Sequence, residues 1–279
     1  MDEPTHALLS VADGLLEVFT AERDAPWTIA AAHPADPLGA GTAALLSAAA
    51  GATTRVVNPR GLGGSRPAEA APTLAAMVDD LEAVRLALGL PPWIFWGMSG
   101  GGFIGQIYAQ RRPEGLRALI VESAAPCFRA SVDDPASLLS PRNPAWAGAL
   151  AEAGLRPADA DHDHDAAARW RSLAAERWVW CVDEVARLVV PGAVSTTMQR
   201  AMPEIWRFDA RAGLGSIATP TLVIAGDVDP IAPIAHVRQV HEGIPGSRWV
   251  TIAGGGHVPV AEGRAEVREA VRALLAGLE

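Results

Sequence analysis

Short apolar runs alternate with longer amphipathic segments over the first 125 residues of the chain. Residues 7–11 and 15–20 flank an Asp-Gly turn signal, which predicts a β-hairpin. Further apolar runs bounded by Gly and Pro predict strands, and the segments with apolar residues at helical spacing predict helices. The predicted strands are 27–32, 54–57, 93–96 and 118–122, and the predicted helices are 41–50, 73–88 and 100–111.

The pattern changes between residues 126 and 213, where Pro and Asp clusters accompany amphipathic patches without strand-like alternation. Alternation then resumes, with strands predicted at 221–225 and 249–252 and helices at 234–242 and 264–278. Eight strands alternating with helices predict a mostly parallel sheet covered by helices on both faces. We therefore predict an α/β core formed by residues 1–125 and 214–279, interrupted by a helical cap, or lid, at 126–213.

Composition excludes several function classes. The 279 residues include 23 basic side chains, all of them Arg, and 32 acidic ones, for a net charge of -9. Such a charge argues against a general nucleic-acid binder, and the absence of Lys excludes Schiff-base chemistry and a P-loop. With two Cys, an acidic start at residues 1–4 and no run of about 20 apolar residues, we expect a cytoplasmic protein without membrane association.

The sequence G-M-S-G-G at residues 97–101 lies between a predicted strand and a predicted helix. A G-x-S-x-G sequence at such a turn is typical of a nucleophile elbow, in which Gly allows a strained turn and close packing. The turn would expose the Ser99 hydroxyl and aim the N–H of Gly100 at developing negative charge. The alternative is a Gly-rich turn with a spectator Ser.

A serine nucleophile needs a general base and a carboxylate that orients it. His257 follows three glycines in a loop just after the predicted strand 249–252, which can bring its imidazole over the sheet edge. Asp227 and Asp229 both follow the predicted strand 221–225. Either aspartate is a candidate for the acid.

The order Ser99, Asp229, His257 resembles that of catalytic triads in the α/β-hydrolase superfamily. Residues 224–233 are similar to its acid-bearing stretch and favour Asp229, although Glu122 stands where some members carry their acid. Residues 58–65 look like its D-x-R-G-x-G-x-S loop with Asn in place of Asp, and residues 111–114 resemble its R-x-P-E turn. The resemblance covers residues 5–125 and 214–279 and implies a capped serine hydrolase of the esterase or prolyl-iminopeptidase-like group.

The resemblance also implies an oxyanion hole formed by the N–H groups of Ala35 and Gly100. The loop at residues 33–37 reads H-P-A-D-P, where His-Gly is usual. Pro34 has no N–H to donate, and a charged Asp36 beside an oxyanion would be unfavourable unless it points away. We predict that His33 is a buried structural histidine rather than a second base.

Other potential ligands have simpler interpretations. Alternating Asp and His at 161–165 could bind a metal, but successive residues of an extended loop point in opposite directions, so we predict a solvated loop, no metal and no cofactor. Cys127 and Cys181 are predicted as small buried apolar residues. Aromatic side chains of the cap either pack its helices or line a substrate pocket. The candidates for substrate binding are Trp178, Trp180 and Trp206.

These residues predict acyl transfer in two steps on a small-molecule substrate. The first choice is a carboxylic ester hydrolase acting on a small apolar ester or lactone. A prolyl-iminopeptidase-like enzyme, whose usual H-G-G-P-G loop is absent, and a C–C bond hydrolase are alternatives. A ligand-binding protein on a hydrolase scaffold is an alternative of another class, and the sequence leaves a homodimer open.

Overall fold

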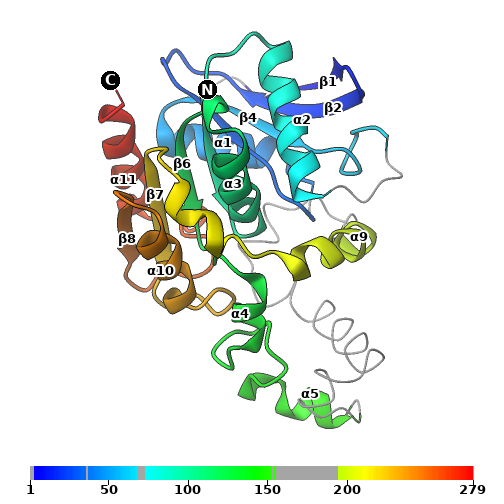
Figure 1. The fold of residues 1–279 in the computed structure, drawn as a ribbon, viewed down its shortest axis with the longest axis vertical. Helices are drawn as coiled ribbons and strands as arrows, with labels where there is room; N and C mark the ends of the chain where they lie inside the picture. Colours follow the sequence, from blue (N-terminus) through cyan, green and yellow to red (C-terminus); the bar gives the residue numbers. More distant parts are fainter. Residues whose placement is uncertain (1–2, 36, 68–72, 153, 155–193, 279) are drawn as a thin grey trace.

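An eight-stranded β-sheet forms the centre of the structure (Figure 1). The computed structural model describes residues 3–35, 37–67, 73–152, 154 and 194–278. The strands are β1 (Thr5–Val11), β2 (Gly14–Ala21), β3 (Thr28–Ala31), β4 (Thr53–Asn58), β5 (Trp93–Met98), β6 (Leu116–Glu122), β7 (Thr221–Gly226) and β8 (Arg248–Ile252). They lie in the order β1-β2-β4-β3-β5-β6-β7-β8. The pairs from β4 to β8 are parallel, and only β2 pairs antiparallel, with β1 and β4.

Helices cover both faces of the sheet. One buried apolar cluster joins it to α1 (Ala40–Ala50) and α11 (Ala265–Ala276). The other joins it to α2 (Leu74–Ala87), α3 (Gly100–Arg111) and α10 (Ile234–Gly243). Strands β5 and β7 are buried at every position because both of their faces meet helices, which explains their continuous apolar runs. The predicted fold class is confirmed, and each predicted core element ends within two residues of its observed bounds.

The described part of the segment 126–213 contains α4 (Phe128–Asp133), α5 (Ala147–Glu152) and α9 (Val194–Arg207). In Figure 1, α4 and α5 extend beyond the end of the sheet, and α9 lies across the same end. The segment enters and leaves the core side by side, because Ala210 N–H donates to Pro126 O at 2.7 Å and Cys127 forms an isolated bridge with Asp209. The limits of a separate cap domain stay a prediction.

Two further features follow from the described residues. None of the described helices is long and apolar enough to cross a membrane. Cys127 is buried and free, which agrees with the prediction of a small buried apolar residue. Cys181 and the Asp-His run at 161–165 lie outside the described residues.

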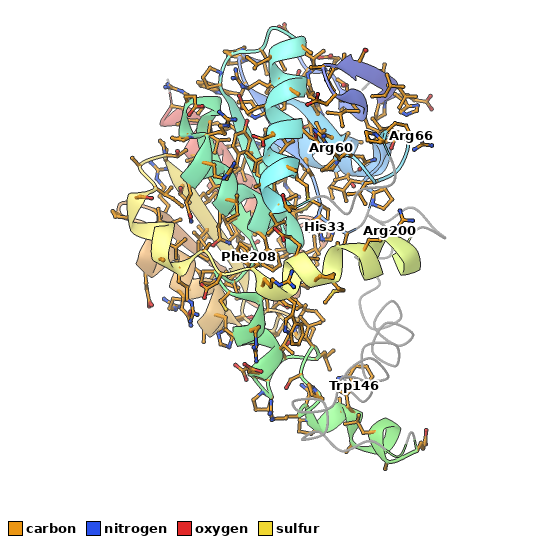
Figure 2. The ribbon with its side chains drawn as sticks, turned by 45° about the vertical axis from the view of Figure 1, so that its right-hand side comes forward. His33, Arg60, Arg66, Trp146, Arg200 and Phe208 are labelled. Carbon is orange, nitrogen blue, oxygen red and sulfur yellow. The ribbon has the colours of Figure 1, made fainter. Side chains whose placement is uncertain are left out.

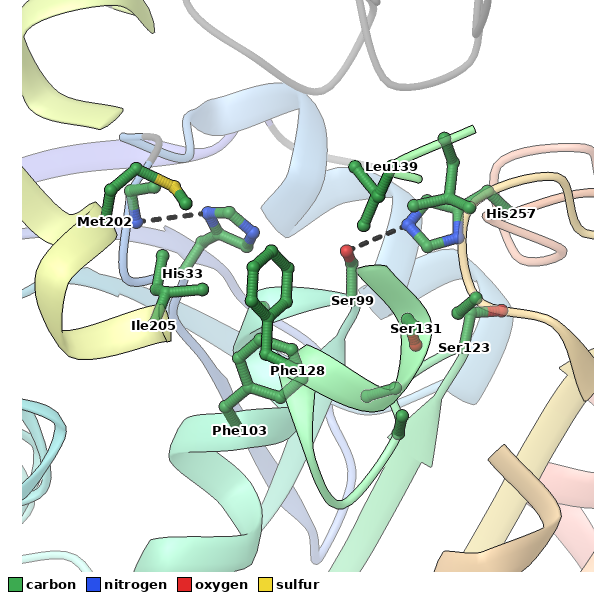
Figure 3. A pocket seen from close by; sticks show the side chains of 16 residues that line it. His33, Ser99, Phe103, Ser123, Phe128, Ser131, Leu139, Met202, Ile205 and His257 are labelled. Carbon is green, nitrogen blue, oxygen red and sulfur yellow. Dashed lines mark hydrogen bonds between the residues drawn. The ribbon is translucent and has the colours of Figure 1, made fainter. Parts of the chain in front are cut away.

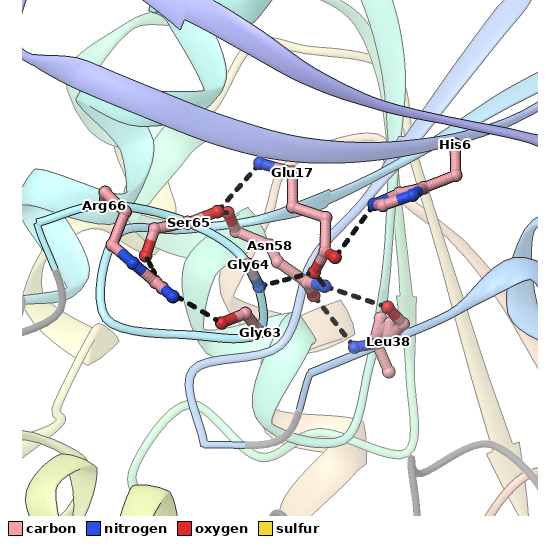
Figure 4. A network of polar contacts seen from close by, with 8 residues as sticks. All are labelled: His6, Glu17, Leu38, Asn58, Gly63, Gly64, Ser65 and Arg66. Carbon is pink, nitrogen blue, oxygen red and sulfur yellow. Dashed lines mark hydrogen bonds and ion pairs between the residues drawn. The ribbon is translucent and has the colours of Figure 1, made fainter.

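Asn58, at the buried end of β4, joins strand β2 to the loop around Leu38 through its amide (Figure 4). Its Nδ2 donates to Glu17 Oε2 at 2.7 Å and to Leu38 O at 3.0 Å, and its Oδ1 accepts from Leu38 N–H at 2.9 Å. Ser65 Oγ donates to Asn58 O at 2.5 Å, and Gly64 N–H donates to Glu17 Oε2 at 3.0 Å. An Asp at this position could not donate to a carboxylate, so Glu17 explains the departure from the more usual Asp.

We predict that Asn58→Asp lowers the free energy of unfolding by about 2–4 kcal/mol at pH 7, because it removes two donated hydrogen bonds and places two carboxylates together out of water. Urea denaturation measures this loss. Asn143→Asp is a matched control, since Asn143 Oδ1 only accepts a hydrogen bond, from Ala145 N–H at 2.9 Å. Equal stability of the Asn58 variant and the wild type at pH 7 would contradict the prediction.

Candidate active site

Ser99 occupies a strained turn between β5 and α3. Its backbone has φ +51° and ψ −122°. Residues other than Gly rarely adopt a positive φ of this size. The turn also requires Gly97, because a Cβ there would lie 2.3 Å from Gly101 O. Ser99 N–H donates to Glu122 O at 2.9 Å, which fixes the turn against the end of the neighbouring strand β6. The Ser99 side chain is thereby presented at the carboxyl edge of the sheet.

The structure brings Ser99, His257 and Asp229 together at this edge, and Figure 3 shows the contact between Ser99 and His257. His257 Nε2 lies 2.8 Å from Ser99 Oγ, and Nδ1 lies 2.8 Å and 3.0 Å from the two oxygens of Asp229. The His257 and Asp229 side chains are each 1% exposed. The tautomer that satisfies both contacts carries its proton on Nδ1 and accepts the hydroxyl proton of Ser99 on Nε2.

Asp229 is held in position by the start of the following loop. Its Oδ1 accepts from the backbone N–H groups of Ile231, at 2.8 Å, and Ala232, at 3.0 Å. These donors fix the plane of the carboxylate so that it faces the imidazole. Asp229 is therefore the acid, among the three candidates, that contacts the ring.

Asp227 and Glu122 instead hold the loop that carries His257. Asp227 Oδ1 accepts from Gly254 N–H at 2.7 Å. Glu122 is fully buried, and its oxygens accept from Val260 N–H and from Trp96 Nε1–H, each at 2.8 Å. Burial raises the pKa of Glu122 to about 7, against the opposing effect of those two hydrogen bonds and of nearby His257. The two rival acids thus contact the backbone around His257 rather than its ring.

The loop after β3 differs from the expected oxyanion geometry. Ala35 is buried beside Ser99, but its N–H donates to His33 Nδ1 at 3.3 Å. The predicted donor to an oxyanion therefore interacts with a side chain of its own loop. His33 is half-buried and lines the cavity, so the prediction of a buried structural histidine needs correction. Asp36 lies outside the described residues.

An apolar cavity opens in front of Ser99. The space in front of the hydroxyl measures about 540 Å³, and this volume includes solvent-open space at its mouth. Figure 3 shows Ser99 and His257 on one side of it and a group of apolar side chains opposite. The large apolar lining residues are Phe103, Phe128, Leu139, Met202, Ile205 and Ile231.

The sequence missed most of this lining. Phe103 lies one turn after Ser99 on α3, and Met202 and Ile205 are three residues apart on α9. Helical spacing alone predicts burial at these positions, not burial against a cavity. Only their proximity to Ser99 in three dimensions identifies them.

The predicted tryptophan contacts are only partly observable. Trp206 is not among the residues that line this cavity, and its role in substrate binding stays a prediction. It packs edge-on against Phe128, with ring centroids 6.1 Å apart, and the Arg129 guanidinium lies over the Trp206 ring, 5.7 Å from its centroid. Trp146 lies near α5, away from His33 (Figure 2). Trp178 and Trp180 lie outside the described residues.

The part of the chain that the structure describes contains no cluster of three His, Cys, Asp or Glu side chains arranged as metal ligands. The polar groups of the cavity are those of His33, Ser99, Ser123, Ser131 and His257. A nucleophile, a base and a carboxylate in one hydrogen-bonded chain can perform acyl transfer without further groups.

Comparison with known proteins gives one family. Residues 40–263 match the family model of the alpha/beta hydrolase fold. The chain is 31% identical over 163 residues to polyketide synthase ThaQ of Burkholderia thailandensis, covering 58% of this chain and 7% of that protein. It is 34% identical over 84 residues to a probable proline iminopeptidase of Streptomyces coelicolor, covering 28% and 26%. The chain thus spans less than two thirds of the length of these curated relatives.

Solved structures with the same fold cover almost the whole chain. An alpha/beta fold family hydrolase from Bacillus anthracis matches with a TM-score of 0.77 at 19% identity, covering 97% of this chain and 99% of that one. Proline iminopeptidase from Mycobacterium smegmatis matches with a TM-score of 0.68 at 21% identity, covering 98% of each chain. At these identities the likeness shows the fold alone.

We predict that Glu122 makes stability depend on pH. Its folded pKa of about 7 lies above its ordinary value of 4.5, so its contribution is fully present below pH 4.5 and is lost as the pH rises through 7. Urea denaturation of the wild type and of Glu122→Gln should show the wild type losing on the order of 2 to 3 kcal/mol relative to the variant between pH 5 and pH 8. A difference that stays constant with pH would contradict the prediction.

Proposed function

Because the chain belongs to the alpha/beta hydrolase fold family, we propose that it is a serine hydrolase that cleaves a small apolar carboxylic ester or lactone. The observation that carries the proposal is the contact of Ser99 with His257, at 2.8 Å, beside an apolar cavity. A hydroxyl that faces a buried imidazole, itself oriented by a carboxylate, is an activated nucleophile.

In the first step, Ser99 Oγ attacks the substrate carbonyl while its proton passes to His257 Nε2. Asp229, 2.8 Å from Nδ1, stabilises the imidazolium that forms. Gly100 is the first residue of α3, and the helix dipole favours negative charge at this end. Its N–H, which has no partner within the helix, donates to the tetrahedral oxyanion. His257 then protonates the leaving alcohol, which departs and leaves an acyl ester on Ser99.

In the second step, water replaces the alcohol. His257 Nε2 takes a proton from the water as it attacks the acyl ester, and the second tetrahedral intermediate collapses when His257 returns that proton to Ser99 Oγ. The products are a carboxylic acid and the restored hydroxyl. For a lactone, the leaving alcohol is part of the same molecule as the acid.

The cavity supports an apolar substrate. Its described lining has six large apolar side chains and no carboxylate. A peptidase that recognises a free amino terminus needs an anionic partner for that amine. The carboxylate of Glu204, on α9, accepts from Leu74 N–H at 3.0 Å and is not among the cavity residues. The described lining therefore favours an ester over an amino-terminal amide.

The comparisons alone leave the bond type open, because the curated relatives include both an iminopeptidase and an esterase. The chain is 25% identical over 171 residues to a pimeloyl-[acyl-carrier protein] methyl ester esterase of Aeromonas hydrophila, covering 58% of this chain and 62% of that protein. An apolar cavity beside Ser99 is consistent with an acyl chain entering it. The carboxylic ester is for this reason the first substrate class to test.

We predict that a fluorophosphonate probe labels Ser99, because the probe reacts with a serine that a neighbouring imidazole activates. Mass spectrometry should find the adduct on Ser99 in the wild type and on no residue in Ser99→Ala. Turnover of p-nitrophenyl esters should fall by about 10⁴-fold or more in the variant.

Ser10→Ala on the edge strand β1 is the matched control and should label and turn over like the wild type. Asp229→Asn should slow labelling by about 10³–10⁴-fold, since it favours the wrong imidazole tautomer. An unlabelled wild type would contradict the proposal and favour a ligand-binding protein.

We predict that Ile205 limits the length of the acyl chain. Ile205→Phe narrows the cavity and should lower kcat/KM for p-nitrophenyl octanoate by about 10-fold or more relative to p-nitrophenyl acetate, because a lost pocket for several methylenes weakens binding. Kinetics across acetate, butyrate, hexanoate and octanoate measure the shift.

Leu86→Phe provides the same change on an exposed side chain, 65% accessible on α2, and should leave the chain-length profile unaltered. The same panel should include proline p-nitroanilide. A higher kcat/KM for this amide than for every ester would overturn the choice of an ester substrate.

A further inference from the structure

We propose that Ser137, in the segment 126–213, is a positioning residue for the acid Asp229, and that it acts through a peptide group of the loop after β7. This assignment rests on the proposed function, because it concerns the orientation of His257 when Ser99 attacks a carbonyl. Ser137 is not among the cavity residues, so its effect on the reaction is indirect.

Two successive peptide groups hold Asp229. Its Oδ1 accepts from Ile231 N–H at 2.8 Å and from Ala232 N–H at 3.0 Å. The Ile231 N–H shares its peptide group with the carbonyl of Pro230, and the Ala232 N–H shares its own with the carbonyl of Ile231. Because a peptide group is planar, the direction of each N–H depends on where the carbonyl of the same group points.

The segment that follows α4 holds both of these carbonyls. Leu138 N–H donates to Pro230 O at 2.7 Å, and Ser137 Oγ donates to Ile231 O at 2.6 Å. Each peptide group is thus bonded at both ends, to Asp229 through its N–H and to this segment through its carbonyl. A hydrogen bond accepted by the carbonyl polarises the N–H of the same group and strengthens the bond that this N–H donates.

The Ser137 hydroxyl is oriented for this contact. Its Oγ accepts from Leu139 N–H at 3.1 Å, and its backbone N–H donates to Asp134 O at 3.0 Å. The residue is fully buried. A hydroxyl has one proton to donate, and here the acceptor for that proton is Ile231 O. Ser137 is therefore the side chain whose removal would free one of the two peptide groups that hold Asp229.

A separate contact keeps the two segments together without this hydroxyl. His236 Nε2, on α10, lies 2.8 Å from Asp134 Oδ2, and Asp134 Oδ1 accepts from Ala136 N–H at 2.8 Å. Together with the backbone bond of Leu138, this contact holds the segment against the loop after β7. Loss of the Ser137 hydroxyl should therefore reorient a peptide group and leave the fold intact.

Two substitutions change the donor with little change in shape. Ser137→Cys keeps a weak donor, and Ser137→Ala has none. We expect kcat for p-nitrophenyl acetate to fall about 10-fold in Ser137→Ala and by less in Ser137→Cys, with KM within threefold of the wild type in both, because a small misplacement of a catalytic group slows the chemical step. A wild-type kcat in Ser137→Ala would overturn the assignment.

Ser140→Ala is the matched control in the same segment. Ser140 is also fully buried, but its Oγ accepts from Arg142 N–H, at 3.3 Å, within its own loop. This variant should have the kcat of the wild type. An equal loss of kcat in Ser140→Ala and Ser137→Ala would show a general effect of the segment and overturn the specific role of Ser137.

A double-mutant cycle tests whether Ser137 acts through Asp229. In the native background, Ser137→Ala should slow fluorophosphonate labelling of Ser99 about 10-fold. In an Asp229→Asn background the carboxylate that Ser137 positions is absent, so the same change should alter the labelling rate by less than about twofold. Equal losses in the two backgrounds would show an independent structural effect and overturn the assignment.

The chain length of the ester distinguishes the acid from the cavity wall. Leu139 and Ile231, the two partners of the Ser137 hydroxyl, both line the cavity. A role through Asp229 lowers kcat/KM by the same factor for p-nitrophenyl acetate and octanoate. A loss confined to octanoate would show that Ser137 shapes the wall instead, and would overturn the assignment.

The labelling reaction also separates failure of this assignment from failure of the proposed function. Labelling of Ser99 at the same rate in the wild type and in Ser137→Ala would overturn the role of Ser137 alone. Absence of labelling in the wild type would overturn both.

Discussion

The strained backbone of Ser99 is the constraint on which the rest of the site depends. A serine at φ +51° persists only when its surroundings hold it, and here β5, β6 and α3 all contribute. The hydrogen bond from Ser99 N–H to Glu122 O ties the turn to the neighbouring strand. Because the same strand end supplies the Glu122 carboxylate that accepts from Val260 N–H, the proposed nucleophile and the loop of its proposed base depend on one strand end.

Acidic side chains position the backbone of this loop at several points. Asp227 accepts from Gly254 N–H, Glu262 from Gly256 N–H and Glu122 from Val260 N–H, so three carboxylates hold the backbone on both sides of His257. Asp229 then orients the ring itself. The excess of acidic residues in the chain thus has a local use at the proposed base, besides its effect on net charge.

The sequence predicted the core well because its signals are local. Buried strands such as β5 and β7 are continuous apolar runs, and the turn around Ser99 has a recognisable Gly pattern. Strand ends that meet at one edge predicted an acid near His257, and the resemblance to the α/β-hydrolase superfamily favoured Asp229 over Asp227 and Glu122. The cavity wall could not be predicted, because Met202 and Ile205 have the spacing of any buried helix face. The interaction of Ala35 with His33 could not be predicted either, since it depends on a ring rotamer.

The paired entry and exit of the segment 126–213 has a consequence for how this protein can diversify. Ala210 N–H donates to Pro126 O, so the two ends of the insertion are joined and it forms a closed loop on the core. The entropic cost of closing such a loop rises only slowly with its length. Phe128, Met202 and Ile205 belong to that loop, whereas Ser99, Asp229 and His257 do not. Exchange of the whole insertion, in natural recombination or in laboratory chimeras, would therefore replace much of the cavity wall. It would leave the residues Ser99, Asp229 and His257 unchanged.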